Sequence, residues 1–139
     1  MGLFQQGEFV LHSGERSDFR IDCNALTAAD IEALAAQLRR RLPEFREVAG
    51  VPSGGERLAA ALAPFATGQV ADLPLIVDDV YTTGSSMAAW RGQQRALGAV
   101  LFARRAVAEP WILPLFTMTR EGGAREKLIR GVWRTGLVR

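Results

Sequence analysis

Apolar residues recur along the chain with two different spacings, and the change between them predicts the order of its elements. Residues 8–23 alternate loosely between apolar and polar around Ser13-Gly14, a pattern typical of a short hairpin. Thr27 and Asp30 match a capping box with Asp in place of Glu, and apolar residues then take helical spacing as far as Pro43. The chain therefore begins with a predicted hairpin followed by a predicted helix.

The rest of the pattern alternates short apolar runs with helix-like segments. The clearest run, 74–80, is apolar until two adjacent aspartates and predicts a buried strand. Further strands are expected at 48–51, 99–103 and 111–116, and further helices at 57–65, 86–97 and 121–133. Strands that alternate with helices in this way predict an α/β domain with a mainly parallel sheet.

Composition narrows the classes of protein that this pattern can represent. The 139 residues are 48% hydrophobic and 23% charged, which is typical of one globular domain, and no apolar run approaches the roughly 20 residues of a membrane span. The N-terminus lacks the layout of a secretion signal. Cys23 is the single cysteine, which excludes an internal disulfide and favours a reducing cytoplasm. With one histidine, His12, it cannot assemble a zinc site.

Charge adds little, because the formal net charge is only +2. Basic residues are more frequent after Arg120, but acidic residues are interleaved with them, which favours a solvated surface over a nucleic-acid contact. Lys127 is the only lysine, so any chemistry that needs a lysine has one candidate.

Three unusual segments follow predicted strands. They are the glycine-rich residues 52–55, the polar residues 78–86 and the pair Arg104-Arg105. Ligands of open parallel sheets bind beyond the carboxyl ends of the strands. We therefore expect these segments to form one ligand site.

The residue types in 78–86 indicate which ligand this site takes. Asp78 and Asp79 offer carboxylates to two ribose hydroxyls, while the hydroxyls and backbone amides that follow suit a phosphate. Gly84 permits a tight turn close to the ligand. A capped helix without a ligand would explain the turn alone, but two acids at a buried strand end favour a site. The expected phosphate residues are Thr82, Thr83, Gly84, Ser85 and Ser86.

Residues 75–86 resemble the PRPP-binding motif of type I phosphoribosyltransferases. Residues 50–55 resemble the pyrophosphate loop of the orotate branch, and residues 11–23 are similar to the N-terminal hood of orotate phosphoribosyltransferases. The resemblance implies one domain with that fold, divided into a hood at 1–26, a core at 27–116 and a C-terminal tail or helix at 117–139. It also implies a homodimer.

The same resemblance assigns roles to individual residues. Asp78 and Asp79 would hold the ribose hydroxyls, and 82–86 would wrap the 5-phosphate. Magnesium would arrive with PRPP, held largely by ligand oxygens and water. The pyrophosphate would face Ser53, Gly54 and Gly55, and the base would lie near Phe19, Arg20, Arg104 and Arg105.

The chain departs from the orotate branch at three places. The family's mobile loop, whose lysine contacts pyrophosphate, is missing, because only the uncharged or acidic residues 66–73 join the second helix to the PRPP strand. His12 stands where the family has Lys or Arg, and is either a general acid or base or a polar hairpin residue. Arg20 replaces an aromatic residue near the base; it either contacts the base or an anion, or is exposed.

Two functions follow from these departures. The chain is either a minimal transferase acting on a nucleobase in pyrimidine metabolism, or a non-catalytic PRPP- or nucleotide-binding regulatory protein. In the first case an arginine must replace the missing lysine, and it comes from Arg57 at the start of the second helix, from the tail or from a partner subunit.

Overall fold

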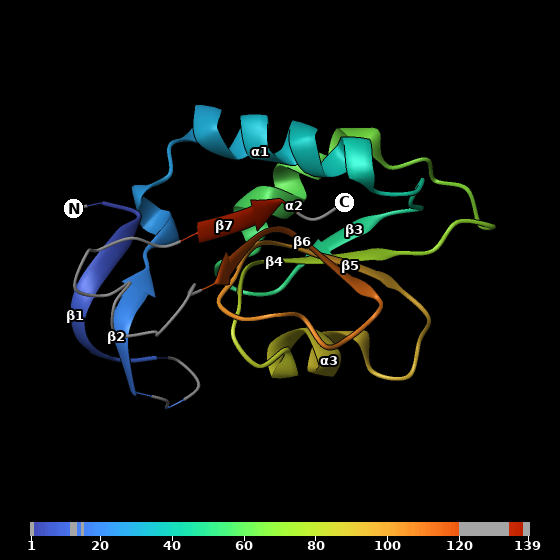
Figure 1. The fold of residues 1–139 in the computed structure, drawn as a ribbon. Coiled ribbons are helices and arrows are strands. Elements are labelled where there is room, and N and C mark those ends of the chain that lie inside the picture. The colour runs from blue at the N-terminus through green and yellow to red at the C-terminus, as the bar shows by residue number, and fades with distance from the viewer. Residues whose placement is uncertain (1, 12–13, 15, 120–133, 138–139) are drawn as a thin grey trace.

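The computed structural model describes residues 2–11, 14, 16–119 and 134–137, and within these a five-stranded sheet forms the centre of the protein (Figure 1). Its strand order is β3-β4-β5-β6-β7, with the first four strands parallel and β7 antiparallel to β6. The sheet strands are β3 (Val48–Gly50), β4 (Leu75–Tyr81), β5 (Leu97–Ala103), β6 (Ile112–Thr119) and β7 (Arg134–Leu137). The predicted α/β class with a mainly parallel sheet is confirmed.

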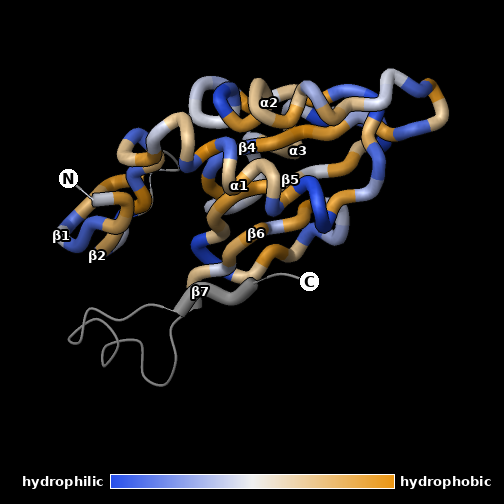
Figure 2. The backbone as a smooth tube through the Cα atoms, turned by 90° about the horizontal axis from the view of Figure 1, so that it is seen from above, coloured by the Kyte–Doolittle hydropathy of each residue, from blue (hydrophilic) through white to orange (hydrophobic). Residues whose placement is uncertain are grey.

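Helices cover both faces of this sheet, and the apolar residues of the strands divide between them. Helices α1 (Ala28–Arg41) and α2 (Glu56–Leu62) lie on one face, and α3 (Ser85–Arg91) lies on the other (Figure 1). In β4, Leu75 and Val77 join the core under α1 and α2, whereas Ile76 packs with Met87 of α3. A strand buried on both faces needs apolar residues at every position, which explains the continuous run (Figure 2).

Helix α1 begins at the predicted capping box. Thr27 Oγ1 accepts a hydrogen bond from the Asp30 amide at 3.1 Å, and Asp30 Oδ2 accepts one from the Thr27 amide at 2.8 Å. The side chains of Ile31, Ala35 and Leu38 recur at helical spacing and are buried against the sheet. The predicted first helix is therefore confirmed. Among the described residues, no helix is both long enough and apolar enough to cross a bilayer.

The hairpin and the second helix also follow the prediction, with small shifts. Strands β1 (Phe4–Val10) and β2 (Arg16–Ile21) pair antiparallel, with an irregularity between Gln6 and Phe9. A short 3-10 turn, η1 (Cys23–Ala25), joins this hairpin to α1, and a second one, η2 (Ala63–Phe65), extends α2. Figure 1 shows the hairpin at one end of the sheet.

Two predictions about the second half of the chain need correction. The helix expected at 86–97 ends at Arg91, because Gly92 leaves helical geometry with a φ of 59° and Leu97 pairs with Leu75 as the start of β5. Where a tail or helix was expected at 117–139, β6 continues to Thr119 and β7 pairs with it. The helix predicted at 121–133 lies outside the described residues.

Candidate functional site

A cleft of about 620 Å³ lies between the hairpin and the carboxyl ends of β3, β4 and β5. It brings together residues from each of the three segments that the sequence singled out. The cleft is lined by residues 9–11 and 20–24 of the hairpin and η1, by 51–54, by 78–87 and by Arg104. The structure therefore brings these segments together at one edge of the sheet, as predicted.

The two acids lie side by side on the cleft wall, at the end of β4. Asp78 Oδ1 accepts a hydrogen bond from the Asp79 amide at 2.8 Å, and Asp79 Oδ1 accepts one from the Val80 amide at 2.8 Å. Burial raises the pKa of Asp78 from 3.8 to about 8, and the hydrogen bond and negative charge of Asp79 add to the effect. At neutral pH the folded protein therefore favours the protonated form of Asp78.

The 52–55 loop packs closely against the end of β4 because two of its residues lack a side chain. A Cβ on Gly54 would lie 2.4 Å from Asp79 Oδ2, and a Cβ on Gly55 would lie 2.5 Å from the Val77 carbonyl oxygen. The Val51 amide donates to that same carbonyl at 2.8 Å. The loop thus brings the exposed Ser53 and Gly54 next to the carboxylate of Asp79. The peptide bond between Pro52 and Ser53 is cis.

The 82–86 loop turns sharply at Gly84, which has a φ of 84°. Only glycine adopts this conformation without strain, as the sequence predicted for a tight turn. On the exposed side, the hydroxyls of Thr83 and Ser85 are hydrogen-bonded to each other at 2.8 Å. The loop therefore presents short hydroxyl groups to the cleft, beside the acid pair.

Of the four residues predicted to lie near the base, two line the cleft. Arg20 lines it, with its Nε donating to Gln5 Oε1 at 2.7 Å and its guanidinium 5.2 Å from the Phe9 ring. Arg104 also lines it, but Nη2 donates to Ser17 Oγ at 2.6 Å and to the Phe19 carbonyl at 3.0 Å. The Arg104 guanidinium lies 3.8 Å from the centre of the Phe19 ring. The contact between Arg104 and Phe19 therefore holds the hairpin against the end of β5.

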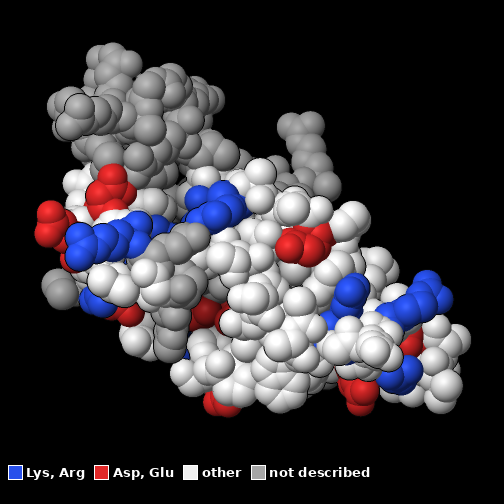
Figure 3. All heavy atoms as spheres, turned by 90° about the horizontal axis from the view of Figure 1, so that it is seen from below, with Lys and Arg blue, Asp and Glu red and all other residues white. Residues whose placement is uncertain are grey.

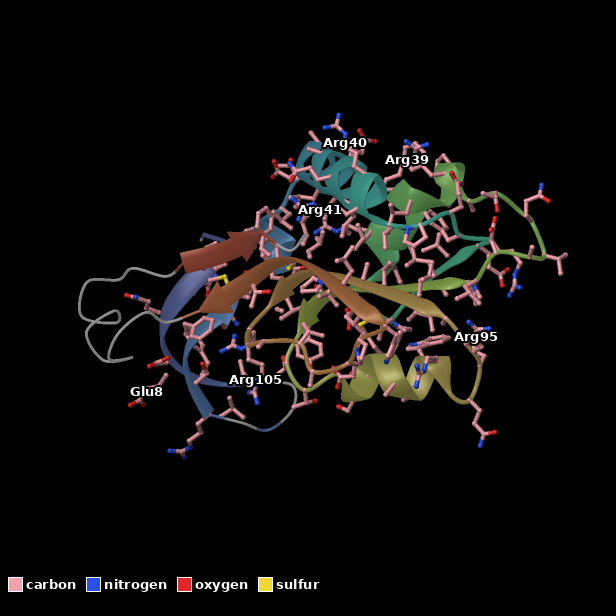
Figure 4. The ribbon with its side chains drawn as sticks, turned by 45° about the vertical axis from the view of Figure 1, so that its right-hand side comes forward. Glu8, Arg39, Arg40, Arg41, Arg95 and Arg105 are labelled. Carbon is pink, nitrogen blue, oxygen red and sulfur yellow. The ribbon has the colours of Figure 1, made fainter. Side chains whose placement is uncertain are left out.

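Phe19 and Arg105 are not among the cleft-lining residues. Phe19 is buried, with 6% of its surface exposed. Arg105 is exposed and lies on the side of the sheet that α3 covers (Figure 4).

Of the two candidate catalytic residues, Arg57 lies within the described part of the chain. The guanidinium of Arg57 is directed to η1: Nη1 donates to the Leu26 carbonyl at 2.9 Å, and Nη2 donates to the Cys23 carbonyl at 2.7 Å. Arg57 thus joins the start of α2 to the end of the hairpin. His12 lies outside the described residues.

Cys23 is a cleft residue to which the sequence assigned no role. It is buried, and its burial together with the nearby carboxylate of Asp79 raises the pKa of the thiol. Cys23 therefore places the start of η1 beside the acid pair.

The segment that replaces the family's mobile loop lies at the opposite edge of the sheet. Residues 66–74 lead into the first residue of β4, far along the strand from the acids at its carboxyl end. They are held in place by backbone hydrogen bonds, with the Arg46 amide donating to Leu73 at 2.9 Å and the Thr67 amide to Phe45 at 2.8 Å. This connection therefore adds no basic group to the cleft.

The charged residues of the protein form no single-signed surface on the face shown in Figure 3, where acidic and basic side chains are interspersed. The three consecutive arginines 39–41 lie at the end of α1, away from the cleft (Figure 4). Arg39 and Arg40 are exposed there, whereas Arg41 is half-buried.

No protein-family model matches the sequence, and no curated protein is significantly similar to it. Solved structures do match. The orotate phosphoribosyltransferase from Aeropyrum pernix superposes with a TM-score of 0.65 and 25% identity, and the match covers 94% of each chain. The Leishmania donovani UMP synthase matches with a TM-score of 0.60 and 22% identity over 73% of this chain.

This chain spans only 29% of the UMP synthase chain. The orotate phosphoribosyltransferase of Mycobacterium tuberculosis, in a complex with Fe(III) dicitrate, matches with a TM-score of 0.52 and 18% identity, over 73% of this chain and 77% of that one. The protein thus has the fold of the type I phosphoribosyltransferases and resembles a shortened orotate phosphoribosyltransferase.

Proposed function

We propose that this protein binds PRPP in the cleft and transfers its phosphoribosyl group to a nucleobase, with orotate as the first candidate, in the pyrimidine nucleotide metabolism of the cytoplasm. One observation carries the proposal. An acid pair, a glycine loop and a hydroxyl-rich loop line the same cleft at the carboxyl ends of parallel strands. A fold alone would not support an activity, because unrelated functions share folds.

The cleft offers a complementary group to each part of PRPP. Asp78 and Asp79 accept hydrogen bonds from the ribose hydroxyls, and the hydroxyls and amides of 82–86 receive the 5-phosphate. Ser53 and the Gly54 backbone face the pyrophosphate, whereas Gly55, predicted for the same role, is buried and does not line the cleft. Arg20, beside the Phe9 ring, lies on the hairpin side of the cleft and faces the base.

Magnesium fits this site as an ion carried by the ligand. Among the described residues, no group of three or more His, Cys, Asp or Glu side chains is placed to hold a metal by itself. The crowded carboxylates of Asp78 and Asp79, one of which keeps its proton to an unusually high pH, favour a cation brought alongside. When bound with PRPP, the ion neutralises pyrophosphate charge.

In the reaction, the bond from the anomeric carbon to pyrophosphate breaks and a bond to a base nitrogen forms. The transition state resembles an oxocarbenium ion, so the chain contributes positioning and charge stabilisation rather than a covalent partner. The acid pair orients the ribose, and the 52–55 loop holds the leaving group against the end of β4.

A binding or regulatory protein without turnover is the second candidate, and the contacts of two arginines favour it. Arg57 donates to carbonyls at η1 and Arg104 to hairpin atoms, and residues 66–73 contain no basic residue. Loss of one well-placed electrostatic contact commonly costs about 3 kcal/mol, or about a hundredfold in rate. We therefore expect orotate turnover to be absent or at least about a hundredfold below that of an orotate phosphoribosyltransferase with the mobile loop.

Calorimetric titration with PRPP and magnesium tests binding, and repeats with orotate monophosphate and other nucleotides rank the ligands. Asp79→Asn should weaken PRPP binding by about 1–3 kcal/mol, because a hydroxyl contact loses its charged acceptor. Glu32→Gln, an exposed carboxylate on α1, is the matched control. Equal affinities for the wild type and Asp79→Asn would rule out the ribose role of Asp79.

Orotate consumption in the presence of PRPP and magnesium tests turnover, with Arg57→Ala beside the wild type. If Arg57 acts only on η1, the variant should lose stability while any turnover changes in proportion to its folded fraction. Turnover equal to that of an enzyme with the mobile loop would overturn the argument about the missing lysine.

We also propose a homodimer. Phe4, Phe65, Val70 and Trp90 are large apolar side chains that remain 45%, 38%, 86% and 48% exposed. Burial of such groups between two copies would be favourable. Sedimentation at tens of micromolar measures the state, and a monomer would contradict this proposal.

A further inference from the structure

Tyr81 and Glu109 form a hydrogen-bonded pair directly beneath the 82–86 loop, with Tyr81 buried and Glu109 half-buried. Tyr81 is the last residue of β4, has 4% of its surface exposed, and donates its hydroxyl to Glu109 Oε2 at 2.6 Å. Glu109 comes from the segment between β5 and β6, 28 residues further along the chain. A hydrogen bond from a hydroxyl to a carboxylate at this length is among the stronger ones in proteins.

The other oxygen of the same carboxylate lies against the loop itself. A Cβ on Gly84 would lie 2.9 Å from Glu109 Oε1 and 2.9 Å from Tyr81 Cε2. Gly84 therefore packs against both Tyr81 and Glu109. Its positive φ is a conformation that glycine adopts without strain. One carboxylate thus connects the end of β4, the turn of the loop and the segment before β6.

From this geometry we propose that Tyr81 and Glu109 are positioning residues that hold the 82–86 loop in its ligand-receiving conformation, and that the charge of Glu109 weakens the affinity of that loop for phosphate. The proposal rests on the proposed function of the loop. Without the pair, a loop centred on glycine would sample many conformations, and ligand binding would have to order it. A carboxylate beside Gly84 also repels a phosphate bound in the same turn.

The chain provides a spectroscopic probe of the pair, because Tyr81 is its only tyrosine. Burial raises the pKa of Tyr81, and the hydrogen bond to Glu109 adds to the increase. Tyrosinate absorbance during a pH titration therefore reports on the surroundings of Tyr81, which include Glu109 and the charge of Arg105. Glu109→Ala should lower the pKa of Tyr81 relative to the wild type, which a loss of packing elsewhere would not do.

The test uses Tyr81→Phe, Glu109→Ala, Glu109→Gln and the double variant Tyr81→Phe/Glu109→Ala, with Glu32→Ala on the exposed face of α1 as the control. Hydrogen exchange of the 82–86 amides is measured without ligand, and PRPP with magnesium is titrated by calorimetry. Tyr81→Phe should speed exchange and weaken PRPP binding about tenfold, the equivalent of one hydrogen bond to a charged group. Glu109→Ala should speed exchange as much but weaken binding less, because it also removes the charge that repels the phosphate.

Two further results separate positioning from charge. Glu109→Gln keeps an acceptor for Tyr81 and removes the negative charge, so it should bind PRPP at least as tightly as the wild type. The double variant should bind no more weakly than either single variant, because both changes remove the same contact.

Exchange rates and affinities within twofold of the wild type in both Tyr81→Phe and Glu109→Ala would overturn the positioning role. A Glu109→Gln protein that binds as weakly as Glu109→Ala would overturn the charge role. Absence of PRPP binding by the wild type would instead refute the proposed function, and the exchange rates would still decide whether the pair holds the loop.

Discussion

Replacing Asp78 with asparagine should make the protein more stable at alkaline pH while weakening its ligand site. Asp78 is half-buried beside Asp79, and burial with that neighbour raises its pKa from 3.8 to about 8. At pH values between these two pKa values, the unfolded chain has released the proton of Asp78 while the folded chain keeps it. The free energy of unfolding therefore falls as the pH rises from about 4 to about 8. Asparagine is neutral throughout and removes this dependence.

The size of the effect follows from the shift. A pKa that rises from 3.8 to about 8 corresponds to about 6 kcal/mol if the whole shift acts on unfolding. Because Asp78 keeps part of its surface in water, screening reduces this value, and we expect Asp78→Asn to gain about 2 kcal/mol at pH about 8. At pH about 4 the two proteins should differ little, since the acid is then protonated in the folded state.

Urea unfolding followed by tryptophan fluorescence measures the difference at several pH values between these limits. Glu32→Gln, which removes an exposed carboxylate on α1, should show the pH dependence of the wild type. If the free energy of unfolding of Asp78→Asn also changes with pH in parallel with that of the wild type, the charges of the acid pair do not destabilise the folded protein. The raised pKa then has no energetic consequence, and the case for a cation beside the pair loses its support.

Two further changes test the close contacts of the site and the start of the fold. Gly54→Ala places a Cβ 2.4 Å from Asp79 Oδ2, so the loop or the carboxylate must move; we expect a cost of about 1–3 kcal/mol in urea unfolding and weaker PRPP binding by calorimetry. An unchanged affinity would mean that the contact does not position the acid. Thr27→Ala removes the cap of α1 and should lower the free energy of unfolding by about 1 kcal/mol while leaving the affinity of the folded protein for PRPP unchanged.

Features that depend on neighbouring residues were predictable from the sequence. The capping box at Thr27 is formed within one helical turn, and the continuous apolar run of β4 indicates a strand that is buried on both faces. The meeting of three ligand segments followed from a rule about parallel sheets, since each segment comes directly after a strand. These inferences needed no knowledge of which side chains touch.

Features that depend on distant pairing were not predictable in the same way. The apolar residues up to Leu97 fit a helix as well as a strand, and the pairing of Leu97 with Leu75 decides in favour of the strand. Strand β7 lacks an alternating pattern and forms because β6 offers it a partner. Arg104 contacts Ser17 across 87 residues and Tyr81 contacts Glu109 across 28, and nothing in either local sequence indicates the partner.

Distant contacts hold the hairpin and the η1 turn that follows it against the rest of the site. Arg57 of α2 donates to the Cys23 and Leu26 carbonyls at η1, and Arg104 donates to the Ser17 hydroxyl and the Phe19 carbonyl of the hairpin. These contacts favour a hairpin that forms a fixed wall of the cleft over one that moves as a lid.

This arrangement sets the electrostatic condition for catalysis. The guanidinium of Arg57 is committed to η1 and that of Arg104 to the hairpin, and the connection before β4 contains no cation. If the proposed transfer takes place, the negative charge on pyrophosphate is balanced by Arg20, which also lines the described cleft, by a basic residue outside the described part of the chain, by a metal ion that arrives with PRPP, or by a second copy of the chain. The ion and the second copy are the sources of positive charge that come from outside this chain. The dependence of any turnover on magnesium and on protein concentration therefore distinguishes the transferase from the binding protein more directly than the fold does.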